Sequence, residues 1–135
     1  MKNLIRKLSV VFSAGAFGGL VNSVSAWLFG ALGITALLGV KLAPHFSEFW
    51  LYSRICWGGV WGVLFLLPFL KGGYVLRGVI LSIAPTLVQL FIVFPFQLGK
   101  GLLGLELGVW TPLFVLIFNA LWGCASGLWL RAAKE

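Results

Sequence analysis

Residues 8–40 decide the fold class of this chain, and they read LSVVFSAGAFGGLVNSVSAWLFGALGITALLGV. The stretch carries no charged residue and would make about 50 Å of helix at 1.5 Å per residue. Three more uncharged stretches follow at residues 55–70, 78–99 and 107–130. The hydrocarbon core of a bilayer is about 30 Å thick and takes about 20 apolar residues of helix. We therefore predict an all-α, polytopic membrane protein with four transmembrane helices in a compact bundle.

The polar breaks between these stretches place the spans at about residues 8–32, 46–70, 75–98 and 107–131, in a single integral membrane domain that covers residues 1–135. Glycines after the first span favour a helix end there, so we expect residues 33–44 to form a loop or interfacial segment. Arg54 and Lys71 enclose too short a stretch to cross a bilayer. The second helix is therefore expected to start earlier, with Pro44 in its first turn.

Proline residues mark two further features of the spans. Pro85 lies well inside the third span, and its missing N–H leaves the Leu81 carbonyl without a helical partner, which predicts a kink. Thr111 followed by Pro112 is typical of a helix start and predicts one near the outer end of the fourth span.

The composition excludes a water-soluble domain. Hydrophobic residues make up 61% of the chain and charged residues 10%, against about 25% charged in soluble domains. The net charge of +7 is spread as single residues at span ends, where lipid headgroups lie. It lacks the clustered groove that a nucleic-acid backbone needs. We therefore predict membrane lipid as a partner and no nucleic acid, and we expect no cofactor.

The basic residues are distributed unequally between the two sides of the predicted spans. Four spans place both termini on one side, and that side carries seven basic residues: Lys2, Arg6, Lys7, Lys71, Arg77, Arg131 and Lys134. The other side carries three, which are Lys41, Arg54 and Lys100. Because cytoplasmic loops are enriched in Lys and Arg, we predict a multi-pass protein of the cell inner (plasma) membrane with both termini in the cytoplasm.

Small residues recur at helical spacing in three of the spans. The glycine pairs that follow the GxxxG pattern are Gly15 with Gly19, Gly58 with Gly62, and Gly123 with Gly127. Lipid provides no hydrophobic drive for helices to associate, so close backbone approach through small residues supplies packing energy instead. These pairs predict helix packing, either within the chain or at the interface of a homo-oligomer or a larger membrane complex.

Polar amides occur near the middle of three spans, at Asn22, Gln89 and Asn119. Hydrocarbon satisfies none of their hydrogen bonds, so they should face inward and meet one another, backbone, water or a ligand. Ser82 and Pro85 lie on the same kinked segment as Gln89. Two hypotheses follow: the amides join the helices, or they form a polar site at the midplane for a permeant species.

The outer start of the second span carries a further group of polar and aromatic residues. Arg54 is expected to extend its side chain outward to the interface, with Trp50 and Trp57 sharing its helix face and available for cation–π contact. His45 and Glu48 are spaced for one helix face but lack the third ligand that a metal site needs, so we interpret them as interfacial anchors.

No recognisable catalytic signature occurs in the sequence, and we expect a protein that is not an enzyme. No titratable residue lies at the centre of a predicted span, which disfavours proton-driven exchange. The leading hypothesis is a small inner-membrane protein that serves as an assembly or accessory subunit, or as a homo-oligomeric scaffold, through glycine-stripe packing. The alternative is a channel or uncoupled carrier for a small or apolar molecule.

Overall fold

The computed structural model describes residues 2–41, 47–67 and 73–134, and it is all-helical, with 83% of residues in helices and no strand in these ranges. The helices in chain order are α1 Lys2–Ala31, α2 Ile34–Leu37, α3 Glu48–Trp61, η1 Gly62–Leu66, α4 Tyr74–Leu81, α5 Ile83–Val88, η2 Gln89–Gln97, η3 Leu102–Gly104 and α6 Thr111–Lys134. Helix η1 and helix η3 are 3₁₀-helices and η2 is a π-helix.

Four helical segments are long and apolar enough to cross a membrane: Asn3–Ala31, Glu48–Leu66, Tyr74–Gln97 and Thr111–Ala133. This confirms the predicted class, an all-helical chain with four candidate spans. The first segment begins about five residues earlier than expected, because Arg6 and Lys7 continue the helix instead of preceding it.

The starts of the second and fourth spans also differ from the expected positions. Helix α3 begins at Glu48, where the Ser47 hydroxyl accepts a 3.1 Å hydrogen bond from the Trp50 backbone N–H as an N-cap. The predicted first-turn residue, Pro44, lies outside the described residues. Helix α6 begins at Thr111 rather than near residue 107, because Gly108 has a φ of 153° that no helix admits.

The third span is divided at Ser82, where the sequence predicts a kink. Pro85 cannot donate to the Leu81 carbonyl, and α4 ends at that residue. The chain continues as α5 because the Thr86 N–H and the Thr86 hydroxyl both bond the Ser82 carbonyl, at 3.1 and 2.8 Å. Beyond α5 the helix widens to the π-helix η2, which contains Pro95.

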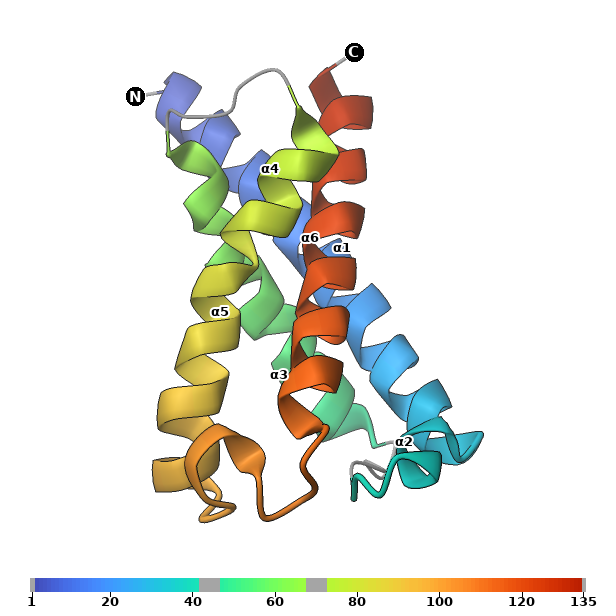
Figure 1. Ribbon diagram of the computed structural model, residues 1–135. Helices are drawn as coiled ribbons and strands as arrows, with labels where there is room; N and C mark the ends of the chain where they lie inside the picture. The colour runs from blue at the N-terminus through green and yellow to red at the C-terminus, as the bar shows by residue number, and fades with distance from the viewer. Residues whose placement is uncertain (1, 42–46, 68–72, 135) are drawn as a thin grey trace.

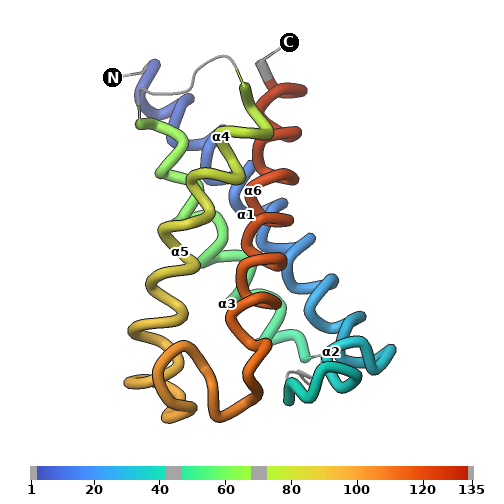
Figure 2. Tube along the Cα trace, in the orientation of Figure 1, coloured from blue at the N-terminus to red at the C-terminus, as the bar shows by residue number. Residues whose placement is uncertain are grey.

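Both termini lie at the same end of the molecule, which we call the terminal end, and α2 lies at the opposite, loop end (Figures 1 and 2). Helix α1 packs against α3 and α6, and α6 also packs against α4 and α5. In the α6 span, 50% of an apolar stretch of 18 residues is buried inside the molecule, against 22% of the corresponding stretch in the second span. Helix α6 is therefore the central element of the fold.

The glycines predicted to pack do so within this one chain, in two contacts toward the terminal end. In the first, between α1 and α3, a Cβ atom added at Gly15 would lie 2.8 Å from the Gly62 Cα, and one at Gly58 would lie 2.6 Å from the Gly15 carbonyl oxygen. Such distances leave no room for a side chain. Gly19 joins the same contact, where an added Cβ would lie 2.7 Å from the Arg54 carbonyl oxygen.

The second glycine contact joins α4 to α6. Gly78 and Gly123 face each other so closely that a Cβ on either would overlap the backbone of the other. One helical turn further along α6, Gly127 meets the Tyr74 backbone in the same way. Gly78 is not part of the predicted glycine pattern, because the residue four positions later is Ser82 and not a second glycine.

Candidate functional site: a polar pocket beside Arg54

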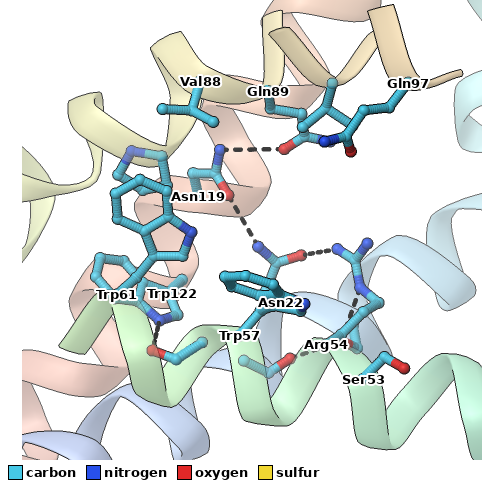
Figure 3. A pocket seen from close by; sticks show the side chains of 15 residues that line it. Asn22, Ser53, Arg54, Trp57, Trp61, Val88, Gln89, Gln97, Asn119 and Trp122 are labelled. Atoms are coloured by element: carbon cyan, nitrogen blue, oxygen red, sulfur yellow. Dashed lines mark hydrogen bonds between the residues drawn. The ribbon is translucent and has the colours of Figure 1, made fainter.

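A chain of side-chain hydrogen bonds connects four helical segments in the loop-end half of the molecule. The Arg54 Nη2 on α3 donates to the Asn22 Oδ1 on α1 at 2.8 Å, and the Asn22 Nδ2 donates to the Asn119 Oδ1 on α6 at 3.1 Å. The Asn119 Nδ2 then donates to the Thr86 Oγ1 on α5 at 3.0 Å and lies 3.5 Å from the Gln89 Oε1. We call these five residues the amide network, and Figure 3 shows Asn22, Arg54, Gln89 and Asn119 from it.

The amide network lies well inside the candidate spans. Arg54 is six residues beyond the start of α3, about 9 Å along the helix, and Asn119 is eight residues beyond the start of α6, about 12 Å along it. Asn22 and Asn119 are 8% and 6% exposed. Two of the three predicted midplane amides are therefore buried together and directly bonded, and Gln89 lies at the margin of the network.

The expectation that Arg54 extends outward is wrong, because its guanidinium turns inward. Besides the bond to Asn22, the Arg54 Nε donates to the Ser23 Oγ at 2.9 Å, and that hydroxyl donates to the Gly19 carbonyl at 2.7 Å. Gly19 has no side chain at this crossing, so α1 and α3 approach closely enough for a short reach between them. Two hydrogen bonds to nearby acceptors therefore hold the guanidinium inside, in place of an extended side chain that would reach the membrane interface.

The aromatic residues near Arg54 have different roles. The guanidinium carbon lies 5.2 Å from the centre of the Trp50 ring, which confirms the expected cation–π contact for that residue. Trp57 is 64% exposed and lies at the pocket described next. Trp122 of α6 is 3% exposed, and its Nε1 lies 3.1 Å from the Gly15 carbonyl oxygen and 3.3 Å from that of Gly58. Trp122 thus ties α6 to the glycine contact.

A pocket of about 390 Å³ lies beside the amide network, between α3 and the α5–η2 segment (Figure 3). Its polar lining comes from the network residues Asn22, Arg54, Gln89 and Asn119, with Ser23, Ser53 and Gln97. Three tryptophans, Trp57, Trp61 and Trp122, form much of its apolar wall together with Pro85, Val88 and Val93. The volume falls in the range of about 300–1,000 Å³ that small-molecule sites occupy.

The pocket carries a positive charge without a matching negative one. Arginine stays protonated in proteins and has five N–H groups, of which Arg54 uses two in bonds to Asn22 and Ser23. No acidic side chain lines the pocket in the described parts of the chain. The side chains of Ser53 and Gln97 also line it, and neither has a hydrogen-bond partner among the described residues. The pocket can therefore donate several hydrogen bonds to an anion or a carbonyl oxygen.

Several predicted residues take no part in this pocket. Ser82 is buried and bonds the Val79 carbonyl at 2.5 Å, so it supports the break in the third span instead of lining the site. Glu48 is exposed in the first turn of α3, and His45 lies outside the described residues. Pro85 does line the pocket, as does Gln89.

Sequence reasoning missed Ser23, Ser53, Thr86 and Gln97 as residues of the site. Ser23 and Thr86 each follow a predicted residue directly, Asn22 and Pro85 respectively. Their hydroxyls can also bond their own helices, so spacing alone does not reveal that they serve a neighbouring helix. Gln97 lies on the π-helix η2, whose wider winding shifts the face that a 3.6-residue period would assign.

Comparison with protein-family models, with curated proteins and with solved structures finds no match to this chain. The functional interpretation therefore depends on the geometry and chemistry of the pocket.

Proposed function

We propose that this chain is a four-helix bundle of the cell inner (plasma) membrane, with cytoplasmic termini, that binds a small anion in the pocket beside Arg54. It would act as a channel or as an uncoupled carrier. One observation carries this proposal: the Arg54 guanidinium faces a pocket of about 390 Å³, deep in a candidate span, and none of the described residues that line this pocket is acidic. An unpaired charge in the membrane interior is costly and is usually functional.

The neutral surroundings of Arg54 support an anion over a cation. Asn22 and Ser23 hold the guanidinium through their oxygens without cancelling its charge. The side chains of Ser53 and Gln97, which have no partner among the described residues, can donate further hydrogen bonds to the same anion. The tryptophan side chains of the wall suit an apolar part of that anion. Arginine keeps its proton, so the site offers no exchangeable proton for coupling. This favours passive conduction or uncoupled transport.

Binding can be tested by calorimetry on the purified protein with benzoate and with its neutral counterpart, benzamide. We expect benzoate to bind and benzamide to bind at least tenfold more weakly, because only benzoate places a charge against Arg54. Arg54→Gln should abolish the difference, whereas Arg54→Lys should retain part of it, since it keeps the charge. Lys100→Gln, which removes an exposed charge outside the pocket, is the matched control. Equal binding of the two compounds to the unmodified protein would refute the anion site.

Transport can be tested in proteoliposomes loaded with potassium chloride, nitrate or acetate, with valinomycin to balance the charge. The proposal predicts anion efflux that Arg54→Gln reduces at least tenfold and that Lys100→Gln leaves unchanged. Benzoate binding without efflux of any of these anions would refute conduction while keeping the binding site.

An assembly or scaffold role is the alternative proposal. The glycine pattern of the sequence favours this role. In the structure, however, Gly15, Gly58, Gly62 and Gly123 pack against neighbouring helices of the same chain. A second copy would therefore need another surface. A single oligomer size in several mild detergents, together with no response to any anion, would favour the assembly role over the anion site.

A further inference from the structure

A second pocket, of about 570 Å³, lies at the terminal end between α1, η1, α4 and α6. Three cationic side chains line it: Arg6 and Lys7 from α1 and Arg77 from α4. The rest of its lining is almost entirely apolar, and it includes Val10, Val11, Leu66 and Leu130. This pocket is separate from the one beside Arg54, and the two share no lining residue.

Arg77 is held firmly at the wall of this pocket. Its Nη2 donates to the backbone carbonyls of Phe65 and Leu67, and its guanidinium carbon lies 5.8 Å from the centre of the Phe65 ring. These carbonyls are exposed by the 3₁₀ turn η1, which leaves the last helical acceptors unpaired. The Arg77 Nε is buried and has no protein partner among the described residues. Both bonds to carbonyls use Nη2, so the Nη1 N–H groups of this fixed cation form no hydrogen bond among the described residues.

The three cations lack protein counter-ions in the described structure. Arg6 and Lys7 are exposed on the first turns of α1 and form no ion pair there. Glu48 and Glu106 both belong to the loop end, and the remaining acidic residue, Glu135, lies outside the described residues. A cluster of three positive charges at the mouth of an apolar pocket matches a molecule with an anionic head and a hydrocarbon body.

We propose that this pocket binds an anionic glycerophospholipid. Its phosphate accepts hydrogen bonds from Arg6, Lys7 and Arg77, and an acyl chain lies against the apolar wall formed by Val10, Val11 and Leu130. The level of the pocket agrees with this, since Arg6 and Lys7 lie at the start of the first candidate span and Arg77 near the start of the third, where headgroups meet the hydrocarbon core. The proposal is independent of the anion site beside Arg54.

Native mass spectrometry of the full chain in mild detergent tests the site, with phosphatidylglycerol and phosphatidylcholine supplied in equal amounts. We expect the unmodified protein to retain phosphatidylglycerol in preference to phosphatidylcholine. The double variant Arg6→Gln, Lys7→Gln should lose about five- to thirty-fold of this preference, because each basic residue near an anionic lipid contributes about fivefold. Both residues are exposed, so the variant should fold. The control Lys41→Gln, Lys100→Gln removes the same charge from the loop end and should keep the preference.

Two outcomes would overturn the proposal. If the loop-end variant loses as much preference as the Arg6 and Lys7 variant, net charge and not this pocket selects the lipid. If millimolar inorganic phosphate displaces phosphatidylglycerol completely, the ligand is a free phosphate and the apolar wall has no role. Retention of phosphatidylglycerol against phosphate, with loss only in the Arg6 and Lys7 variant, supports the lipid site.

Discussion

The two halves of this molecule are held together by different means. Toward the terminal end, α1 meets α3 and α4 meets α6 through glycine, with backbone against backbone and no space for a side chain. Toward the loop end, α1, α3, α5 and α6 are joined by the side chains of Asn22, Arg54, Thr86 and Asn119, which reach from one helix to the next. Figure 1 shows α1 and α5 diverging in that direction.

The difference teaches how a short chain can both pack tightly and keep a pocket. Glycine contacts bring two helix axes close and leave no space for a side chain at the contact itself. Amide and guanidinium side chains span a wider separation, and a hydrogen-bonded chain stabilises helices without filling the space between them. In this protein the glycine-packed terminal half (the tight half) positions the helices, and its pocket of about 570 Å³ lies at the terminal end beside Arg6, Lys7 and Arg77. The hydrogen-bonded loop-end half (the open half) holds the pocket of about 390 Å³ beside Arg54.

The largest expected effect concerns which side of the membrane each end faces, and it is all-or-none. In a background of Cys56→Ala and Cys124→Ala, a cysteine at Asn3 should react with an impermeant thiol reagent only after the membrane is opened. A cysteine at Leu102, at the loop end, should react in intact cells, because the basic residues favour a cytoplasmic terminal end. Reaction at residue 3 in intact cells would reverse the orientation.

A large stability effect should follow from any side chain in the tight half. Gly15→Ala places a Cβ 2.8 Å from the Gly62 Cα and 2.9 Å from its nitrogen, so the two helices must move apart. We expect unfolding in detergent to become easier by about 2–3 kcal/mol, as overpacking typically costs. Gly73→Ala is the matched control, because its Cβ would make an ordinary 3.6 Å contact with Leu76. Similar stabilities of the two variants would show that backbone contact is not what closes the terminal half.

A smaller and graded effect should distinguish the centre of the amide network from its margin. Asn119→Leu removes bonds to both Asn22 and Thr86 and leaves buried polar groups unsatisfied, which should cost about 2 kcal/mol. Gln89→Leu removes one long contact of 3.5 Å and should cost about 0.5 kcal/mol or less. Chemical denaturation in detergent measures both. If Gln89→Leu costs as much stability as Asn119→Leu, Gln89 belongs to the centre of the amide network and not to its margin.

The sequence predicts the four candidate spans, the break near Pro85 and the amides that meet, because each follows from a local rule. Helix length and hydropathy identify spans, proline removes one hydrogen bond, and a buried amide needs a partner. The inward turn of Arg54 does not follow from such a rule. It depends on the crossing of α1 and α3 at Gly19, which brings the Ser23 hydroxyl within 2.9 Å, and a crossing is a property of two helices together.

The position of Gln97 in the site was unpredictable from the sequence for a related reason. Gln97 belongs to a π-helix that follows the proline break, and both features alter the angular position of residues beyond Pro85. A period of 3.6 residues, applied from the start of the third span, therefore loses accuracy toward its end. The glycine pairs show the opposite case, since all their members except Gly62, the first residue of η1, lie in α-helix, where the faces follow from spacing alone.

The smallest expected effect concerns the cation–π contact that supports Arg54. The guanidinium carbon lies 5.2 Å from the Trp50 ring centre, an arrangement worth about 0.5–1 kcal/mol at partly exposed sites. Trp50→Leu keeps an apolar side chain but removes the ring face, so it should lower stability by that amount and weaken benzoate binding about two- to fivefold through a less fixed Arg54. Trp50→Phe should recover part of the loss, because phenylalanine retains a weaker ring interaction. Calorimetry on the two variants checks the order. If Trp50→Leu binds benzoate as tightly as the unmodified protein, hydrogen bonds from Asn22 and Ser23 alone fix the guanidinium, and the open half needs no aromatic support.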